Sequence, residues 1–169
     1  GAIWRDHPLQ IVEQYYAWSQ NYQENQITIV YDTMWDGTKQ LAHRIATEIS
    51  ALSPDTKVKL YNVSISDKND IMTEVFRSKA IVVGSPTVGQ SIMSSVGGWL
   101  DFLKELKFKN KKAAVFGCYG WSGEATKELR ERLTNAGFAV IEPEIKCNWN
   151  PGEEDFSKAV EIAKALCEE

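Results

Sequence analysis

The sequence of 169 residues predicts an α/β fold, with helices covering both faces of a doubly wound, five-stranded parallel sheet. Segments with strand-like apolar runs alternate with segments of helical spacing, which is typical of βαβ units. Two runs, Ala80–Gly84 and Ala113–Gly117, are continuously apolar, as expected of strands buried on both faces of a parallel sheet. Right-handed crossovers between five such strands fit the order 2-1-3-4-5.

The first half of the chain opens with an additional helix. Apolar side chains recur at helical spacing between Leu9 and Trp18, and Ser66 or Asp67 is placed to cap a later helix. Pro54 and Asp55 mark a turn. The predicted elements of this half are a helix over 7–20, a strand over 26–32, a helix over 37–51, a strand over 56–63 and a helix over 67–77.

The second half repeats the alternation three times. Each continuous apolar run is followed by a stretch with helical spacing, so the crossovers are predicted to be helical. The predicted elements are a strand over 80–84, a helix over 91–104, a strand over 113–117, a helix over 122–136, a strand over 138–146 and a helix over 153–168.

Three loops of this fold are unusually rich in Gly, small hydroxyl residues and aromatic residues. They span 33–38, 85–90 and 118–124, after the first, third and fourth predicted strands. Ligands of doubly wound sheets bind beyond the carboxyl ends of the strands, where the strand order reverses. The three loops are therefore predicted to meet at one ligand site.

The first loop has the chemistry of an anion site. It joins a strand directly to a helix, whose first N–H groups lack partners and whose dipole favours negative charge. Thr33 and Thr38 add hydroxyl donors, and the loop itself has no Lys or Arg before Lys39. A phosphate here is held mainly by neutral donors. Neither a Walker loop nor the G-x-G-x-x-G dinucleotide motif is present.

The other two loops suit a flat conjugated ring. Gly120 and Gly123 let the backbone approach closely, and Trp35, Tyr119 and Trp121 are placed to stack on the ring or border it. A purely structural interpretation stays open for individual residues. Trp35 and Trp121 could serve as loop or core-covering side chains, Met34 could be a packing residue, and Cys118 is expected to contribute its backbone rather than its thiol.

Composition excludes several classes of function. The net charge of −4 argues against a nucleic-acid-binding surface, and no apolar run approaches the about 20 residues of a membrane helix. No signal peptide is visible. The three cysteines form no C-x-x-C pair and the two histidines lie far apart, so neither a disulfide framework nor a metal cluster is indicated. A cytoplasmic location is expected.

Three motifs together resemble the flavodoxin-like domain of flavodiiron proteins, the A-type flavoproteins. The motifs are Tyr31-Asp32-Thr33-Met34-Trp35-Asp36-Gly37-Thr38, Gly84-Ser85-Pro86-Thr87 and Gly117-Cys118-Tyr119-Gly120-Trp121-Ser122-Gly123-Glu124-Ala125. The opening Ile3-Trp4-Arg5 and the helix through Tyr15 and Trp18 resemble the segment that joins this domain to the diiron domain. The resemblance implies a linker segment and helix over 1–24 and a flavodoxin-like domain over 25–169.

The resemblance also implies FMN as the cofactor, bound by all three loops. Thr33, Met34, Trp35, Asp36, Gly37 and Thr38 are expected at the phosphate, Ser85, Pro86, Thr87 and Val88 along the ring and ribityl chain, and Cys118, Tyr119, Gly120, Trp121, Ser122 and Gly123 on the other side of the isoalloxazine. Two departures bear on affinity and potential. Val88-Gly89-Gln90 stands where the family often has an apolar residue and two Asn, and Cys118 stands where Ser is common.

The implied partner is the diiron domain, which resembles a metallo-β-lactamase, in the parent protein or a dimer partner. A rubredoxin-type electron donor is a further implied partner. Neither the diiron part nor a rubredoxin module with paired C-x-x-C motifs lies in this sequence. The start at Gly1 is interpreted as a cut at a domain border, and the chain alone is expected not to reduce dioxygen or nitric oxide at a metal.

These inferences predict a one-electron carrier with noncovalent FMN. The second and third loops carry no Lys or Arg, so a negatively charged reduced flavin gains little cationic help and its potential is expected to be low. Glu124 adds to this effect if it points inward. Two alternatives stay open: a flavin-dependent quinone or NAD(P)H reductase, and a signalling module such as a phosphoryl receiver, although strand three ends without the acceptor Asp.

Overall fold

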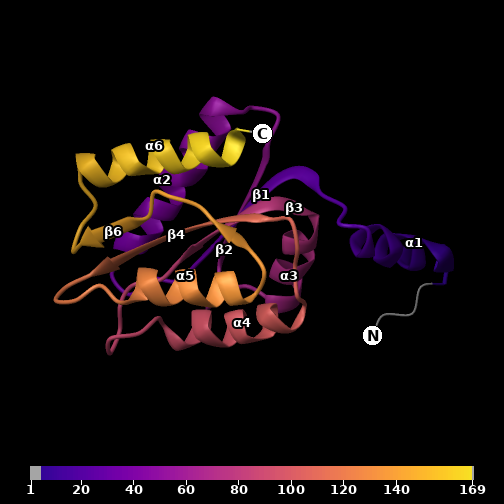
Figure 1. Cartoon of the computed structure of the whole chain (residues 1–169), viewed down its shortest axis with the longest axis horizontal. Helices are drawn as coiled ribbons and strands as arrows, with labels where there is room; N and C mark the ends of the chain where they lie inside the picture. Colours follow the sequence, from indigo (N-terminus) through magenta and orange to yellow (C-terminus); the bar gives the residue numbers. More distant parts are fainter. Residues whose placement is uncertain (1–4, 169) are drawn as a thin grey trace.

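The computed structural model describes residues 5–168 and contains the predicted doubly wound parallel sheet (Figure 1). Ile3 and Trp4 of the predicted linker lie outside the described residues. The order β2-β1-β3-β4 confirms the predicted topology, and two short strands pair with the far edge of β4. The strands are β1 (Glu24–Tyr31), β2 (Lys57–Asn62), β3 (Ser78–Gly84), β4 (Lys112–Tyr119), β5 (Ala139–Val140) and β6 (Ile145–Asn148).

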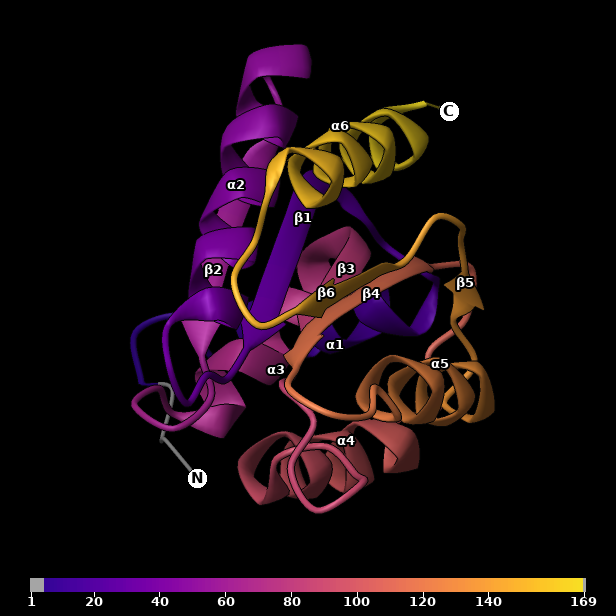
Figure 2. The same ribbon diagram turned by 90° about the vertical axis from the view of Figure 1, so that its left-hand side faces the viewer.

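The helices form one layer on each face of the sheet (Figure 2). Helices on both faces were predicted; α2 and α6 cover one face and α3, α4 and α5 the other. Asp67 caps α3 by accepting a hydrogen bond of 2.7 Å from the Asn69 N–H. The helices are α1 (Pro8–Ser19), α2 (Gly37–Leu52), α3 (Lys68–Arg77), α4 (Ser94–Glu105), α5 (Ala125–Asn135) and α6 (Glu153–Cys167).

The fifth predicted strand is divided in two, which corrects the prediction of one strand over 138–146. Strand β5 pairs with the start of β4 and β6 pairs with its end, and residues 142–144 belong to neither strand. Pro143 has no N–H to donate to a ladder, so pairing is interrupted there. The interruption leaves β6 to end beside the loop that follows β4.

Two hydrophobic clusters hold the layers together. One lies between the sheet and α3, α4 and α5, and contains the almost fully buried Trp99. The other lies between the sheet and α2 and α6, and contains Phe116 and Ile145 from neighbouring strands. Because β1, β3 and β4 supply buried residues to both clusters, their apolar runs are continuous rather than alternating.

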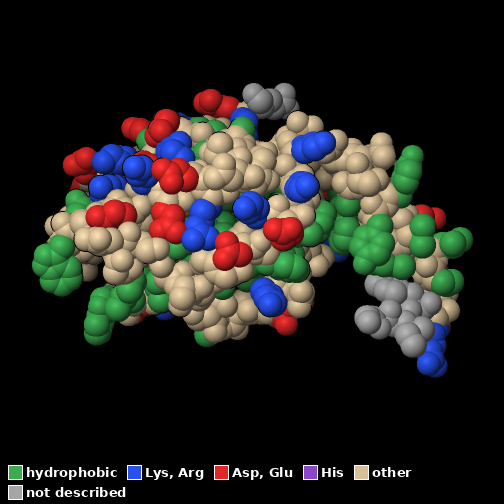
Figure 3. All heavy atoms as spheres, turned by 60° about the horizontal axis from the view of Figure 1, so that its bottom comes forward, with side chains coloured by type: hydrophobic (Ala, Val, Ile, Leu, Met, Phe, Trp, Pro, Cys, Tyr) green, Lys and Arg blue, Asp and Glu red, His purple; other side chains and the backbone are tan. Residues whose placement is uncertain are grey.

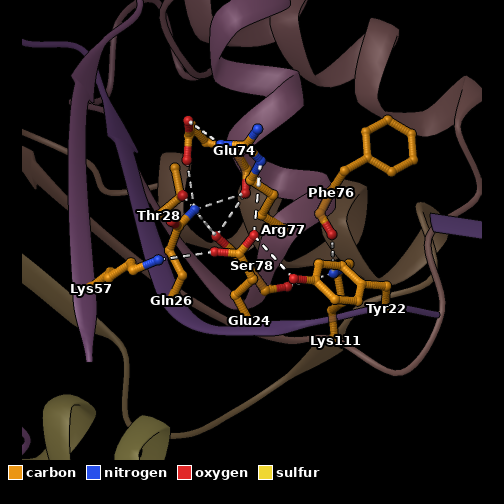
Figure 4. Close-up of polar contacts among 10 residues, drawn as sticks. All are labelled: Tyr22, Glu24, Gln26, Thr28, Lys57, Glu74, Phe76, Arg77, Ser78 and Lys111. Carbon is orange, nitrogen blue, oxygen red and sulfur yellow. Dashed lines mark hydrogen bonds and ion pairs between the residues drawn. The ribbon is translucent and has the colours of Figure 1, made fainter. Parts of the chain in front are cut away.

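Buried polar side chains gather at the amino ends of the strands, opposite the predicted site (Figure 4). Gln26 of β1 donates to the Glu74 carboxylate at 2.8 Å and to the Ser78 hydroxyl at 3.2 Å. The hydroxyls of Thr28 and Ser78 are 2.8 Å apart. The side chains of Gln26, Thr28 and Ser78 therefore each have a partner, and the network ties α3 to β1 and β3.

Lys111 is the buried cation of this region. Its side chain is 5 % exposed, and its ammonium donates to the carbonyls of Phe76 and Ser78 (Figure 4). Burial lowers the pKa of Lys111 from 10.5 to about 8. Between these two pH values the unfolded chain binds more protons than the folded chain, so this residue makes stability rise with pH.

We expect Lys111→Met to remove that contribution. The free energy of unfolding of the wild type relative to the variant should rise by about 1–3 kcal/mol between pH 7.5 and 10.5. Urea unfolding of both proteins across this pH range measures the difference, and titrations common to both proteins cancel. If the free energies of unfolding of the two proteins changed in parallel with pH, the pKa of Lys111 would be the same in the folded and unfolded states.

Candidate functional site

The loops that follow β1, β3 and β4 surround a cavity of about 770 Å³ at the carboxyl edge of the sheet. Figure 2 views the molecule from this end. The cavity lies beyond the neighbouring strands β1 and β3, where the chain leaves β1 toward one face of the sheet and leaves β3 toward the other. The volume is within the range of small-molecule and cofactor sites, about 300–1,000 Å³. The three loops thus meet at one cavity, as predicted.

The cavity brings together thirteen of the sixteen predicted site residues. Every loop contributes, and most of the lining is apolar side chain or backbone. The lining residues among those predicted are Thr33, Met34, Trp35, Gly37, Thr38, Pro86, Thr87, Val88, Cys118, Tyr119, Gly120, Trp121 and Ser122. Their individual roles toward a ligand stay predictions.

Three predicted residues do not line the cavity. Asp36 is exposed and pairs with Lys39 at 3.7 Å. Ser85 is fully buried, where its hydroxyl donates to the Pro86 carbonyl and accepts from the Met93 N–H, both at 2.9 Å. Gly123 packs against the side chain of Lys146. In this structure Ser85 shapes its loop through internal hydrogen bonds.

The first loop presents unused hydrogen-bond donors. Thr38 is 1 % exposed, and the buried hydroxyls of Thr33 and Thr38 have no partner within the protein. Helix α2 begins at Gly37 without a side-chain cap, so its first N–H groups are also free of side-chain partners. Buried polar groups are normally paired, so these orphans point to a ligand that supplies acceptors. A phosphate fits this donor set.

Asp32 fixes the start of this loop from behind. It is 2 % exposed, and its carboxylate accepts hydrogen bonds from the Thr33 N–H at 2.8 Å and from the hydroxyls of Ser64 and Ser95. The two serines lie after β2 and at the start of α4. One buried carboxylate thus joins three segments, and it does not line the cavity.

The second loop is held by a tight turn and a carboxylate. Val88 and Ser91 pair across a turn in which Gly89 and Gln90 have φ of 58° and 62°, as in the type I′ turns of hairpins. Glu128 of α5 accepts from the Ser91 hydroxyl at 2.7 Å. Burial opposes ionisation of Glu128, but hydrogen bonds from Ser91 and Arg132 outweigh it and lower its pKa. Glu128 is therefore a carboxylate at neutral pH, and its hydrogen bonds to Ser91 and Ile92 form a clamp on the second loop.

The first and third loops place large aromatic side chains around the mouth. Trp121 is 90 % exposed and Trp35 83 % exposed. In Figure 3 hydrophobic side chains stand out at the left-hand end of the molecule, where these loops lie in Figure 1. Burial raises the pKa of the Cys118 thiol, so it stays protonated at neutral pH. That Cys118 serves a ligand through its backbone stays a prediction.

The structure adds residues that the sequence did not indicate. Trp149 and Asn150 line the cavity from the loop after β6. Gly89 and Gln90, which belong to the predicted second loop but were not among the predicted site residues, also line it. Lys146 of β6 extends along the third loop, with its ammonium 5.3 Å from the centre of the Tyr119 ring. The segment after β6 was missed because the predicted fifth strand ended at residue 146. Trp149, an aromatic residue shortly after a strand, was a signal that could have indicated it.

Residues 5–168 contain neither a cluster of metal-ligating side chains nor a membrane-spanning helix. No group of three or more His, Cys, Asp or Glu side chains is placed to hold a metal ion. No helix in the same range is long and apolar enough to cross a membrane.

Comparison with known proteins matches the flavodoxin family to residues 29–162. The anaerobic nitric oxide reductase flavorubredoxin of Vibrio vulnificus is 48 % identical over 151 residues, which cover 89 % of this chain and 30 % of that protein. The flavorubredoxin of Escherichia coli strain UTI89 is 45 % identical over 154 residues, 91 % of this chain and 32 % of that protein. The chain spans about a third of the length of these curated relatives.

Solved structures give the same result. Rubredoxin oxygen:oxidoreductase of Desulfovibrio gigas aligns with a TM-score of 0.86 and 32 % identity, covering 92 % of this chain and 38 % of that one. The flavodiiron protein of Giardia intestinalis aligns with a TM-score of 0.87 and 25 % identity, covering 98 % and 41 %.

A doubly wound sheet with a cavity lined by three loops at its switch point is typical of a domain that binds a small molecule or cofactor. The chain belongs to the flavodoxin family, whose domain binds FMN. Within that family it is most similar, among the proteins compared above, to the flavodoxin-like part of flavorubredoxins and flavodiiron proteins.

Proposed function

We propose that the cavity holds FMN and that the chain is the electron-transfer domain of a flavodiiron oxygen or nitric oxide reductase. The observation that carries this proposal is the pair of buried, partnerless hydroxyls of Thr33 and Thr38 at the uncapped start of α2. They match a phosphate, and the glycines and aromatics of the third loop match a flat ring.

FMN supplies one- and two-electron redox chemistry when bound. The protein's own residues then have separable tasks. The first loop donates hydrogen bonds, the clamp at Glu128 holds the second loop in place, and the third loop covers the ring. Cys118, whose thiol stays protonated because it is buried, forms part of the cavity wall.

The electron acceptor in this proposal is the diiron centre of the parent protein or of a dimer partner, and the donor is a rubredoxin-type protein. The names of the relatives support this assignment: flavorubredoxin, flavodiiron protein and rubredoxin oxygen:oxidoreductase. We place the activity in the cytoplasm, where the free thiols of Cys118, Cys147 and Cys167 are stable.

We also propose the division into a linker over 1–24 and an FMN domain over 25–169. Helix α1 projects from the body of the molecule and buries none of its residues (Figure 1). Trp18 stacks on Phe76 with ring centres 4.8 Å apart, but Leu9, Tyr15 and Tyr16 are more than 60 % exposed. Such an apolar helix suits a connection that packs against the rest of the parent protein.

Visible absorption before and after adding FMN tests the cofactor assignment. Bands near ~370 and ~450 nm that stay with the protein through gel filtration are expected for bound oxidised flavin. Riboflavin, which lacks the phosphate, should bind more weakly. If neither compound is retained, the proposal fails. Rapid NAD(P)H oxidation by the loaded chain alone would favour the flavin-dependent reductase instead.

Lys146 is expected to raise the potential of the bound flavin. A cation beside the third loop favours the more negatively charged reduced form, so Lys146→Met should lower the midpoint potential by about 20–60 mV. Lys127→Met, which removes an exposed lysine of α5, is the matched control. Equal potentials in a spectroelectrochemical titration of wild type and Lys146→Met would show that Lys146 does not tune the cofactor.

A further inference from the structure

The loop between β6 and α6 forms a fourth wall of the cavity. Trp149 and Asn150 line the space, and they follow β6, whose end runs beside the third loop. The Trp149 N–H donates to the Tyr119 carbonyl at 2.8 Å. The Asn148 side-chain amide donates to the Gly120 carbonyl at 3.3 Å. The fourth wall is thus bonded directly to the third loop.

The indole of Trp149 packs on the same loop. It lies so close to Gly120 that a Cβ added there would be 3.0 Å from two of its ring carbons. It also meets the Trp121 ring edge to face, with ring centres 5.3 Å apart and planes at 67°. The exposed Trp121 ring therefore packs against the indole of Trp149.

Trp149 reaches the first loop as well. Its carbonyl oxygen would be 3.0 Å from a Cβ added to Gly37, the first residue of α2. One residue therefore touches the phosphate side of the cavity through its backbone and the ring side through its indole.

The backbone of Trp149 is strained. Its φ of 58° lies in the left-handed region, which bulky residues rarely adopt. The side chain is 55 % exposed, so deep burial does not account for this conformation. Strained residues persist where the surrounding structure fixes them, and they cluster at ligand sites.

We propose that Trp149 is a positioning residue that braces the third loop against the start of α2 and so slows the release of FMN. The inference rests on the proposed FMN site and deepens it. The indole holds Gly120 and Trp121 in place, and the strained backbone keeps the indole over them. Loss of the indole frees the third loop to move away from the cavity.

Trp149→Asn tests this role, because Asn tolerates the left-handed conformation and the substitution removes only the indole. We expect FMN to dissociate at least about 10-fold faster, measured as the rise in flavin fluorescence after dilution of the holoprotein. Trp149→Phe keeps an aromatic ring and should restore most of the slow release. Thermal unfolding without FMN should change little in either variant.

The matched control is Phe102→Asn, which removes a partly exposed aromatic side chain of α4 that does not line the cavity. Its release rate should equal that of the wild type. A wild-type release rate in Trp149→Asn would overturn the bracing role, as would equally fast release in Trp149→Phe and Trp149→Asn. A wild-type chain that fails to bind FMN would instead refute the proposed function, so the two failures are distinguishable.

Discussion

Replacing both Thr33 and Thr38 with Val is expected to weaken FMN binding by at least about 100-fold. Each substitution removes one hydroxyl donor to a charged phosphate, worth about 1.5–3 kcal/mol, without changing the shape of the side chain. Equilibrium titration of the FMN-free protein, followed by quenching of flavin fluorescence, measures the change. Riboflavin affinity should fall much less, because riboflavin has no phosphate.

The same double substitution is expected to stabilise the FMN-free protein. Both hydroxyls are buried without partners, and a buried unpaired group costs about 1–3 kcal/mol that Val does not incur. Urea unfolding should therefore give a free energy of unfolding at least equal to that of the wild type. Weaker FMN binding together with higher stability of the FMN-free protein would show that the two hydroxyls serve ligand binding rather than folding.

Thr47→Val is the matched control for this prediction. Thr47 lies on the same helix α2, but its hydroxyl is exposed and donates to the His43 carbonyl at 3.0 Å. Its loss should leave FMN affinity unchanged. Unchanged affinity in the double variant would contradict the assignment of the first loop to the phosphate.

Gly117→Ala is expected to destabilise the protein by about 3 kcal/mol or more. A Cβ at this buried position of β4 would lie 2.1 Å from the Ser85 carbonyl oxygen, which is backbone and cannot rotate away. Overpacking of a core usually costs about 1–3 kcal/mol, and a clash with backbone belongs at or above the upper end. Denaturant unfolding measures the loss, and FMN affinity should fall with it because the second loop starts at Ser85.

Gly98→Ala is the matched control, since a Cβ there meets nothing within 4 Å. Gly98 is an exposed residue inside α4, where Ala is the better helix former by up to about 1 kcal/mol. The two Gly→Ala changes should therefore act in opposite directions. A stable Gly117→Ala variant would show that β3 and β4 separate at this point without cost.

Local patterns in the sequence predict the elements and the strand order of this fold. The runs Ala80–Gly84 and Ala113–Gly117 are apolar on both faces because both helical layers cover them. The three loops are recognisable because glycines, hydroxyls and aromatics follow strands directly, and parallel topology brings those strand ends to one edge. Such features depend on neighbours in the chain, so one sequence suffices to find them.

Other features depend on contacts between distant segments. Pro143 interrupts the predicted fifth strand. Its second part, β6, pairs with the end of β4, and this pairing brings Lys146 and Trp149 beside the third loop. Asp36 belongs to the first loop by sequence, yet its side chain points to Lys39 rather than the cavity.

The sequence by itself thus determined the doubly wound fold and the three loops of the site, because short-range patterns encode secondary structure and turn chemistry. The flavin was implied by the resemblance of those three loops to the flavodoxin-like domain of flavodiiron proteins. Only the tertiary structure decided which hydroxyls lack partners, which glycines allow close approach and which fourth segment completes the cavity. Those features arise from packing and strand register between residues far apart in the chain, where no local pattern carries the information.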